Sequence, residues 1–177
     1  MPDEVKMAFE QKGVQYIRNL HGGFGPGPSW QQTFETTDKS VIAEHCKEND
    51  ILFQWDEDDN LRLIEKRKAI IEHPETGEKV WFNQADQFHP TTNTPEVYEA
   101  LMEIYEDDPH EMPQYACFND DSEIPMEMLD AIRKTTDENT VKFTWEKGDL
   151  LLLDNVLASH GRTPFSGPRK ILVAMSS

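Results

Sequence analysis

The chain has 177 residues, of which 37% are hydrophobic, and a formal net charge of -17. This length and apolar content suffice for one domain with a hydrophobic core. The negative charge repels nucleic-acid phosphates and anionic lipid surfaces, so we expect neither as a partner. The two cysteines, Cys46 and Cys117, are not closely spaced, and we find no leader and no membrane-length apolar run. We therefore expect a cytoplasmic protein with reduced cysteines.

The amino-terminal part of the sequence predicts a helix, a strand and a glycine-rich loop. Pro2, the acids that follow it and Gly13 predict a helix that ends at Gly13. Residues 14–20 predict a strand, and the loop at 22–28 contains four glycines and two prolines. This loop lacks the Gly-Lys-Ser/Thr ending and the following helix of a phosphate-binding loop. We therefore expect no nucleotide there.

The middle of the sequence predicts short strands separated by turns, with two further helices and one more near the end. Capping residues at 36–38 begin a helix that runs to about Lys47, and Pro95 after Thr94 begins another. The remaining expected elements are strands at 51–55, 61–71, 79–84 and 141–145, turns at 58–60 and 73–78, an irregular stretch at 109–117, and a helix at 125–134. Many short strands with regular turns are typical of a jelly roll.

Two apolar runs near the carboxyl end predict a closing pair of strands. Gly148 and Asp149 open a run of four leucines at 150–153, which is typical of a strand buried on both faces. A second apolar run, at 171–175, follows a loop rich in glycine and proline, so the two runs are expected to pair antiparallel. His160 then lies just past the first strand and Arg169 at the start of the second. We expect both side chains at one mouth of the sheet.

An imidazole beside a guanidinium suits a particular chemistry. Neutral imidazole binds ferrous iron, and a face of two histidines and one carboxylate leaves positions open for a co-substrate and oxygen. A guanidinium binds a carboxylate through two parallel hydrogen bonds and stays charged at any working pH. A dicarboxylic keto acid needs both groups, iron for its keto-acid end and arginine for its far carboxylate.

Several stretches of this sequence resemble the taurine dioxygenase (TauD/TfdA) superfamily of iron(II)- and 2-oxoglutarate-dependent oxygenases. The matching words near the carboxyl end are Leu-Leu-Leu-Asp-Asn at 151–155, His-Gly-Arg-Thr-Pro-Phe at 160–165 and Gly-Pro-Arg-Lys-Ile-Leu-Val-Ala-Met at 167–175. Upstream, Ser-Trp-Gln at 29–31, Trp-Phe-Asn-Gln at 81–84 and Phe-His at 88–89 also match. The sequence is most similar to the branch with SyrP-like hydroxylases and clavaminate synthase relatives, and the resemblance covers most of the chain.

This resemblance implies a mostly β fold with flanking helices, namely a partial double-stranded β-helix (jelly roll) of the clavaminate synthase-like type. It implies Fe(II) and 2-oxoglutarate as cofactor and co-substrate. His160 is expected to bind the metal and Arg169 to bind 2-oxoglutarate. Lys170 competes with Arg169, because strand alternation directs only one of them inward. Arg162 is expected to touch the co-substrate or to brace the loop that carries His160.

Three residues upstream are candidates for substrate binding. Asn83, Gln84 and His89 lie in matching words, and the resemblance implies that they line the substrate pocket. A hydrogen-bond network at a strand end explains the same residue types equally well. Both interpretations stay open at this point.

The family's remaining iron ligands form a His-x-Asp or His-x-Glu pair. His73 and Glu75 are the only such pair in this sequence, but Pro74 and the residues that follow predict a solvent-facing turn. The family places its pair further upstream, in an amino-terminal portion whose motifs we do not find in this sequence. We therefore interpret residues 1–177 as the carboxyl-terminal part of a single oxygenase domain, with the amino-terminal part that carries the pair missing.

Two functions from different classes are consistent with these patterns. The first is an Fe(II)/2-oxoglutarate-dependent dioxygenase that hydroxylates an amino acid or a natural-product intermediate, free or tethered to a carrier. The second is a non-catalytic jelly-roll remnant that acts as a binding or partner module. Besides the substrate, the expected partners are the missing amino-terminal half or further copies of the chain in an oligomer.

Overall fold

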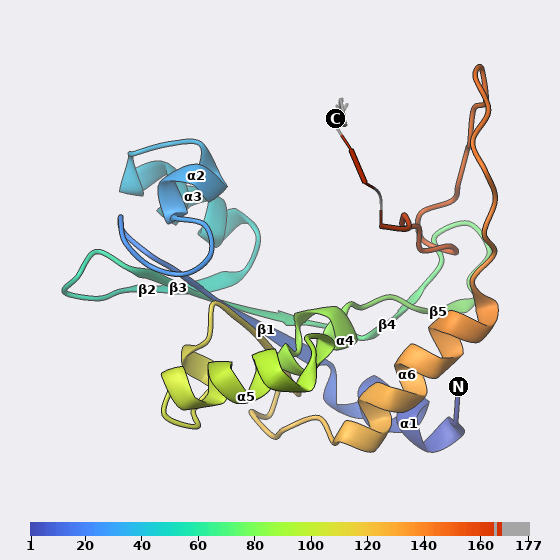
Figure 1. Ribbon diagram of the computed structural model, residues 1–177, viewed down its shortest axis with the longest axis horizontal. Coiled ribbons are helices and arrows are strands. Elements are labelled where there is room, and N and C mark those ends of the chain that lie inside the picture. The colour runs from blue at the N-terminus through green and yellow to red at the C-terminus, as the bar shows by residue number, and fades with distance from the viewer. Residues whose placement is uncertain (165, 168–177) are drawn as a thin grey trace.

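A four-stranded antiparallel sheet forms the centre of the computed structural model, which describes residues 1–164, 166 and 167. The strand order is β2-β3-β1-β6, with β1 at Val14–Leu20, β2 at Ile51–Trp55, β3 at Leu61–Arg67 and β6 at Gln114–Cys117. β1 pairs with β3 along its whole length, from Val14 opposite Arg67 to Leu20 opposite Leu61. Figure 1 shows helices gathered at both ends of this sheet.

Two helices cover one end of the sheet. α2 (Trp30–Phe34) begins at Ser29, whose side chain accepts from the backbone of Gln32 in a capping box. α3 (Lys39–Glu48) begins at Asp38, as the sequence predicts, because the Asp38 carboxylate accepts from Ser40 N. A hydrophobic cluster joins both helices to β1 and β3; its buried members are Leu20, Trp30, Ile42, Cys46, Leu61 and Leu63.

A larger core lies at the other end, where α1 (Asp3–Lys12), α4 (Ala85–Phe88) and α6 (Met126–Asn139) meet β1 and β6. Phe9 of α1 is fully buried, with its ring 4.8 Å from that of Trp81 and 5.1 Å from that of Phe118. The buried members of this core are Val5, Phe9, Val14, Ala69, Ala85, Ala116, Phe118, Ile124, Leu129 and Ile132. Segments distant in the sequence therefore share one core.

The other elements lie around this body. β4 (Ile70–Glu72) and β5 (Lys79–Trp81) form a separate two-stranded hairpin. α5 (Pro95–Ile104) begins with Pro95 at its first position, as predicted, but buries none of its residues. The short 3₁₀ helices η1 (Pro90–Thr92) and η2 (Pro109–Glu111) flank α5 in the sequence. No helix in the described residues is long and apolar enough to cross a bilayer.

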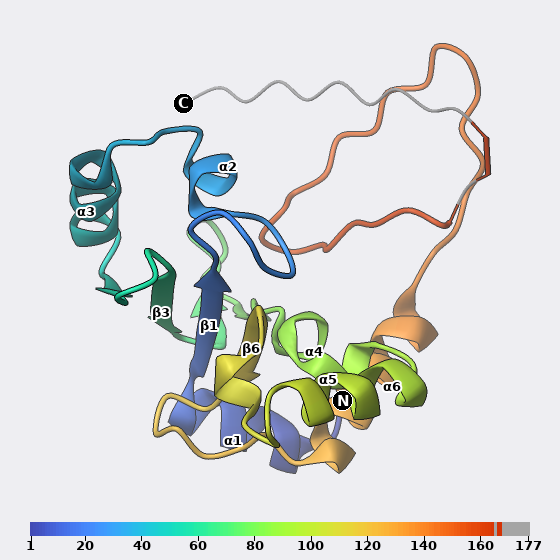
Figure 2. The ribbon, with the colours of Figure 1, turned by 60° about the vertical axis from the view of Figure 1, so that its left-hand side comes forward.

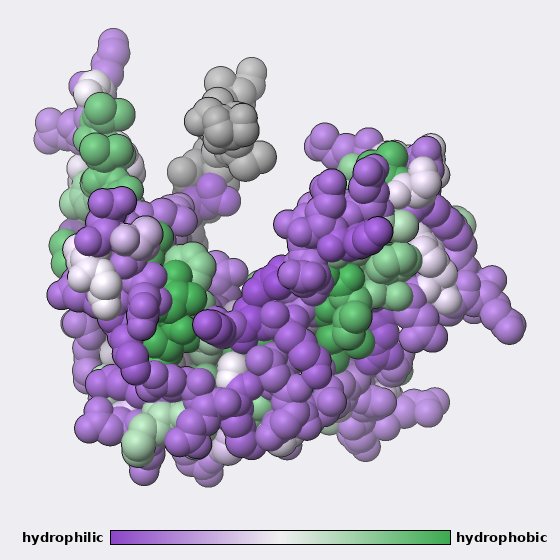
Figure 3. Space-filling model, turned by 180° about the vertical axis from the view of Figure 1, so that it is seen from behind, coloured by the Kyte–Doolittle hydropathy of each residue, from purple (hydrophilic) through white to green (hydrophobic). Residues whose placement is uncertain are grey.

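Residues 140–164, which we call the arm, leave the body after α6 and form neither helix nor strand. Figures 1 and 2 show the arm as an extended excursion away from the sheet. Apolar side chains line it, as Figure 3 shows, and several are strongly exposed: Val141 86%, Phe143 56%, Trp145 58%, Leu150 93% and Leu152 92%. The arm therefore has strand-like sequence, but no strand among the described residues pairs with it.

Several sequence predictions are wrong for the described residues. The fold mixes helices with antiparallel strands and is not mostly β. The stretches at 141–145 and 150–153 form no strands, because nothing in the described part of the chain offers them backbone partners. β6 lies inside a stretch expected to be irregular, and α2 follows the glycine-rich loop where no helix was expected. The jelly roll stays a prediction, and the strand at 171–175 falls outside the described residues.

Candidate functional site

The motif residues that suggest iron chemistry lie in the arm. His160 and Arg162 are both exposed and belong to no regular element. Arg169 and Lys170 fall outside the described residues, so the expected meeting of His160 with Arg169 stays a prediction. In this chain the side chain with the strongest sequence signal therefore lies on the surface.

No second and third iron ligand gather around His160 in the described structure. Residues 165 and 168–177 include no His, Cys, Asp or Glu, so every other potential ligand of this chain lies among the described residues. Within those, one group of three brings its ligand atoms together, and it consists of His110, Cys117 and Asp121. The described residues therefore do not fit a three-ligand iron face at His160.

His73 is committed to a structural contact and is buried, although the sequence predicts a solvent-facing turn at 73–78. Its Nδ1 accepts from the backbone N–H of Glu75 at 3.3 Å and of Thr76 at 3.1 Å. The proton is therefore on Nε2, which donates to Asp154 Oδ2 at 2.9 Å. Since both ring nitrogens are engaged, His73 has no free lone pair for a metal.

The contact between His73 and Asp154 also joins the arm to the β4–β5 hairpin across 81 positions of sequence. The hydrogen bond from His73, followed by the backbone N–H of Val156, lowers the pKa of the Asp154 carboxyl. Asp154 is thus held as a carboxylate, the form that accepts from His73.

Asn83 and Gln84 lie immediately before α4. The Asn83 amide donates to Ala69 O at 3.1 Å, and its oxygen accepts from Ala85 N at 3.1 Å. The Gln84 side chain is exposed, and its backbone N–H donates to the Tyr16 hydroxyl at 2.8 Å. These bonds fit the network interpretation of Asn83, while substrate binding by either residue stays a prediction.

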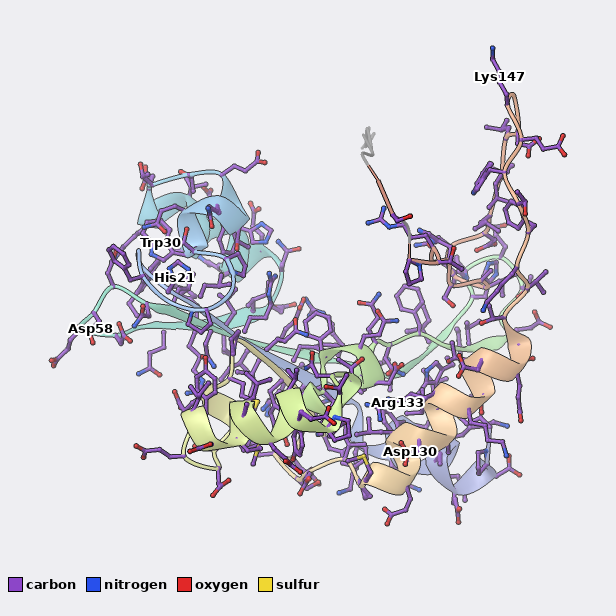
Figure 4. All side chains as sticks on the ribbon, in the orientation of Figure 1. His21, Trp30, Asp58, Asp130, Arg133 and Lys147 are labelled. Carbon is purple, nitrogen blue, oxygen red and sulfur yellow. The ribbon has the colours of Figure 1, made fainter. Side chains whose placement is uncertain are left out.

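His89, the third candidate, is buried in the body with 3% of its surface exposed. Arg133 of α6, labelled in Figure 4, donates to Thr91 Oγ1 at 2.8 Å. The Thr91 hydroxyl then donates to His89 Nδ1, also at 2.8 Å. Burial, with a smaller contribution from the Arg133 charge, lowers the pKa of His89 to about 4. The ring is therefore neutral near pH 7.

The glycine-rich loop at 22–28 borders a hollow. A pocket of about 320 Å³ lies between this loop, the end of β1 and the β2–β3 turn. Gly22 lets the glycine-rich loop lie close to the β2–β3 turn, because a Cβ at this position would lie 2.5 Å from Asp59 O. Arg62 lines the pocket but is paired with Glu111 at 2.7 Å. His21, at the start of the loop, is labelled in Figure 4.

Comparisons with known proteins agree with the motif. Residues 1–175 match the family model described as "Taurine catabolism dioxygenase TauD, TfdA family". The dapdiamide synthesis protein DdaC from Enterobacter agglomerans is 38% identical over 173 residues, covering 98% of this chain and 51% of that protein. A clavaminate synthase-like protein from Arabidopsis thaliana is 26% identical over 177 residues, covering 97% of this chain and 50% of that protein.

The chain thus spans about half the length of these curated relatives. The relatives confirm the predicted superfamily and its clavaminate synthase-like branch. Since the family model extends over nearly every residue and includes the motif around His160, the chain belongs to the taurine catabolism dioxygenase TauD, TfdA family.

Proposed function

We propose that this chain is part of an Fe(II)- and 2-oxoglutarate-dependent oxygenase, of which it forms the carboxyl-terminal portion. The observation that carries this proposal is the family match over residues 1–175, which includes the His160 motif. In this proposal His160 supplies one iron ligand, Arg169 binds the far carboxylate of 2-oxoglutarate, and Arg162 supports one of these two groups.

The remaining iron ligands come, in this proposal, from polypeptide outside the chain. Two observations support this arrangement: no set of three ligands forms around His160 in the described residues, and the relatives are about twice as long as the matched segment. The exposure of His160 leaves its imidazole accessible to a second set of ligands. A metal held in this way provides the centre at which oxygen and the keto acid react.

The proposed substrate is a small molecule, either an amino acid or a natural-product intermediate. The name of the Enterobacter agglomerans relative, a dapdiamide synthesis protein, supports this class. The net charge of -17 disfavours polyanionic substrates.

Anaerobic titration with Fe(II) and 2-oxoglutarate tests the proposal, because chelation of the keto acid to iron gives a weak visible charge-transfer band. We expect no band from the 177-residue chain alone. A longer version that restores upstream sequence should give the band at one iron per chain. His160→Ala should abolish that band, whereas His45→Ala, at an exposed position of α3, should retain it.

Two other outcomes would contradict the proposal. A band from the 177-residue chain that disappears in His73→Ala and in Glu75→Ala would show that this pair completes the triad. No band from the longer version, although it folds, would favour the non-catalytic binding module instead.

A further inference from the structure

Three potential metal ligands meet near the end of the edge strand β6. His110 lies in η2, Cys117 is the last residue of β6, and Asp121 follows in the next turn. Their ligand atoms all lie within 4.8 Å of one another. Backbone hydrogen bonds from Phe118 N to Ser122 O at 2.9 Å and from Asp121 N to Phe118 O at 3.0 Å define that turn. These backbone hydrogen bonds hold the turn that carries Asp121 close to the end of β6.

The imidazole of His110 has a carboxylate partner. Its Nδ1 lies 3.2 Å from Asp108 Oδ1, a contact that favours the tautomer with the proton on Nδ1. The Nε2 lone pair is then available to a metal. Histidines that bind metals commonly have such a carboxylate on the opposite nitrogen, because it fixes the tautomer and the ring orientation.

Gln15 supplies a second, independent observation. It is 1% exposed and lies directly opposite Cys117 in the β1–β6 register. Its amide nitrogen donates to Asp121 Oδ1 at 2.7 Å and to Cys117 Sγ at 3.5 Å, so the side chain points into the cluster. Its amide oxygen is buried and finds no hydrogen-bond donor in the part of the chain that the structure describes.

A bound cation would give the buried Gln15 oxygen a partner. Rotating the amide by half a turn exchanges its nitrogen and oxygen. In the metal-free cluster that rotation would place the oxygen against the Asp121 carboxylate, so the nitrogen faces inward. A cation between the side chains would reverse this preference, since an amide oxygen is a metal ligand and an amide nitrogen is not.

We propose that His110, Cys117 and Asp121 bind a zinc-type transition-metal ion, with Gln15 Oε1 as the fourth ligand. Mixed nitrogen, sulfur and oxygen donors suit such ions, whereas Mg²⁺ and Ca²⁺ prefer oxygen alone. Four protein ligands make a closed, structural type of site. The ion would tie η2 and the turn after β6 to β1.

Binding requires a modest contraction of the cluster. Donor atoms around a tetrahedral zinc lie roughly 3.3–3.8 Å apart, as follows from metal–ligand distances of about 2.0–2.3 Å. The present spread of 4.8 Å exceeds this by about 1 Å. His110 is only partly buried and Asp121 is exposed, so both side chains have room to move inward.

Co(II) is the probe of choice for this site, because a thiolate ligand gives Co(II) an intense charge-transfer band in the near ultraviolet. Ligand sets of histidine and carboxylate alone, such as the iron face of the proposed function, lack this band. We expect the full chain, reduced and anaerobic, to show it at one equivalent of Co(II), together with tetrahedral visible bands. Zn(II) should displace both signals.

Matched variants identify the ligands. Cys117→Ser should abolish the thiolate band, whereas Cys46→Ser, at the equally buried cysteine of α3, should retain it. Asp121→Asn should weaken Co(II) binding. The variant should fold, because Asp121 is exposed and Asn is tolerated at its φ of 63°. Asp108→Asn should weaken binding on the order of tenfold.

The absence of a thiolate band in the folded full chain would overturn the proposal. So would a band that survives Cys117→Ser but is lost in Cys46→Ser. If Cys117→Ser does not fold, the Asp121→Asn titration decides, since unchanged Co(II) affinity in that variant would equally contradict the site. The cluster would then be a hydrogen-bond network centred on Gln15.

Discussion

His89 stays neutral in the folded chain because its ring is buried and Arg133 lies nearby, and its pKa of about 4 is below the usual 6.5. Above pH 6.5 the ring is neutral in both the folded and the unfolded chain. Between about pH 6.5 and 4 the unfolded chain takes up a proton that the folded chain does not. The free energy of unfolding therefore falls as the pH falls through this window.

The variant His89→Asn should remove this pH dependence, while the Asn oxygen can accept from Thr91 N, as His89 Nδ1 does at 3.4 Å. The slope of the unfolding free energy against pH should decrease by up to about 1.4 kcal/mol per pH unit. Chemical unfolding of both proteins at several pH values measures it, and the difference between them cancels the carboxylates that titrate nearby. His45→Asn, at an exposed site on α3, is the control. Parallel curves for the parent chain and His89→Asn would contradict this account.

Arg169 carries the prediction for the co-substrate. In a version of the protein that binds iron, Arg169→Lys should weaken 2-oxoglutarate about tenfold or more and leave iron affinity nearly unchanged. The reason is that a point charge replaces a two-bond fork, in which each charge-assisted bond is worth roughly 1.5–3 kcal/mol. Calorimetric titration measures both affinities. Unchanged affinity here, with a loss in Lys170→Met, would assign the role to Lys170.

At the scale of the element, α6 and α5 differ in how deeply they are anchored. Ile132 of α6 is 1% exposed and belongs to the larger core, whereas Ile104 at the end of α5 is 68% exposed. Ile132→Ala should lower the free energy of unfolding by about 2–5 kcal/mol, because it opens a cavity. Ile104→Ala should change it by no more than about 0.5 kcal/mol. Denaturant unfolding of both variants checks the contrast, and equal losses would contradict it.

The elements that the sequence predicts well carry local signals. Asp38 caps α3 and Pro95 begins α5, and both determine a helix start without help from distant residues. β6 carries no such signal, because four residues between Pro113 and Phe118 become a strand only by pairing with β1. The leucine run at 150–153 fails in the opposite way, since its strand-like composition needs a partner strand that the described residues do not provide.

The site residues also differ in whether a local sequence pattern reveals them. His160 and Arg169 are recognisable because they lie in contiguous words of a family motif. His110, Cys117 and Asp121 occupy an irregular-looking stretch, and Gln15 lies about a hundred positions away. Only the register that places Gln15 opposite Cys117 brings them together, and no spacing rule in the sequence contains that register.

For the whole molecule, the exposed arm predicts self-association of the isolated chain. Leu150 and Leu152 are more than nine-tenths exposed, and contiguous apolar surface of this kind promotes contact between molecules. The double variant Leu150→Thr with Leu152→Thr should lower the apparent mass in concentration-dependent light scattering at physiological salt. Val41→Thr, which changes an exposed residue of α3, should leave association unchanged. A monodisperse parent chain would contradict the prediction.

The exposed backbone of the arm also determines where a protease first cuts the chain. Lys147 stands at its far tip (Figure 4), in unpaired backbone that fits readily into a trypsin cleft. After a nick there, the carboxyl-terminal fragment would be held to the body through contacts such as the hydrogen bond between His73 and Asp154. The hydrogen bond between His73 and Asp154 is partly solvated, since the Asp154 side chain is 46% exposed, and it is too weak by itself to retain the fragment. We expect a fragment ending at Lys147 to accumulate first, so that a single cleavage separates His160 and Arg169 from the folded body.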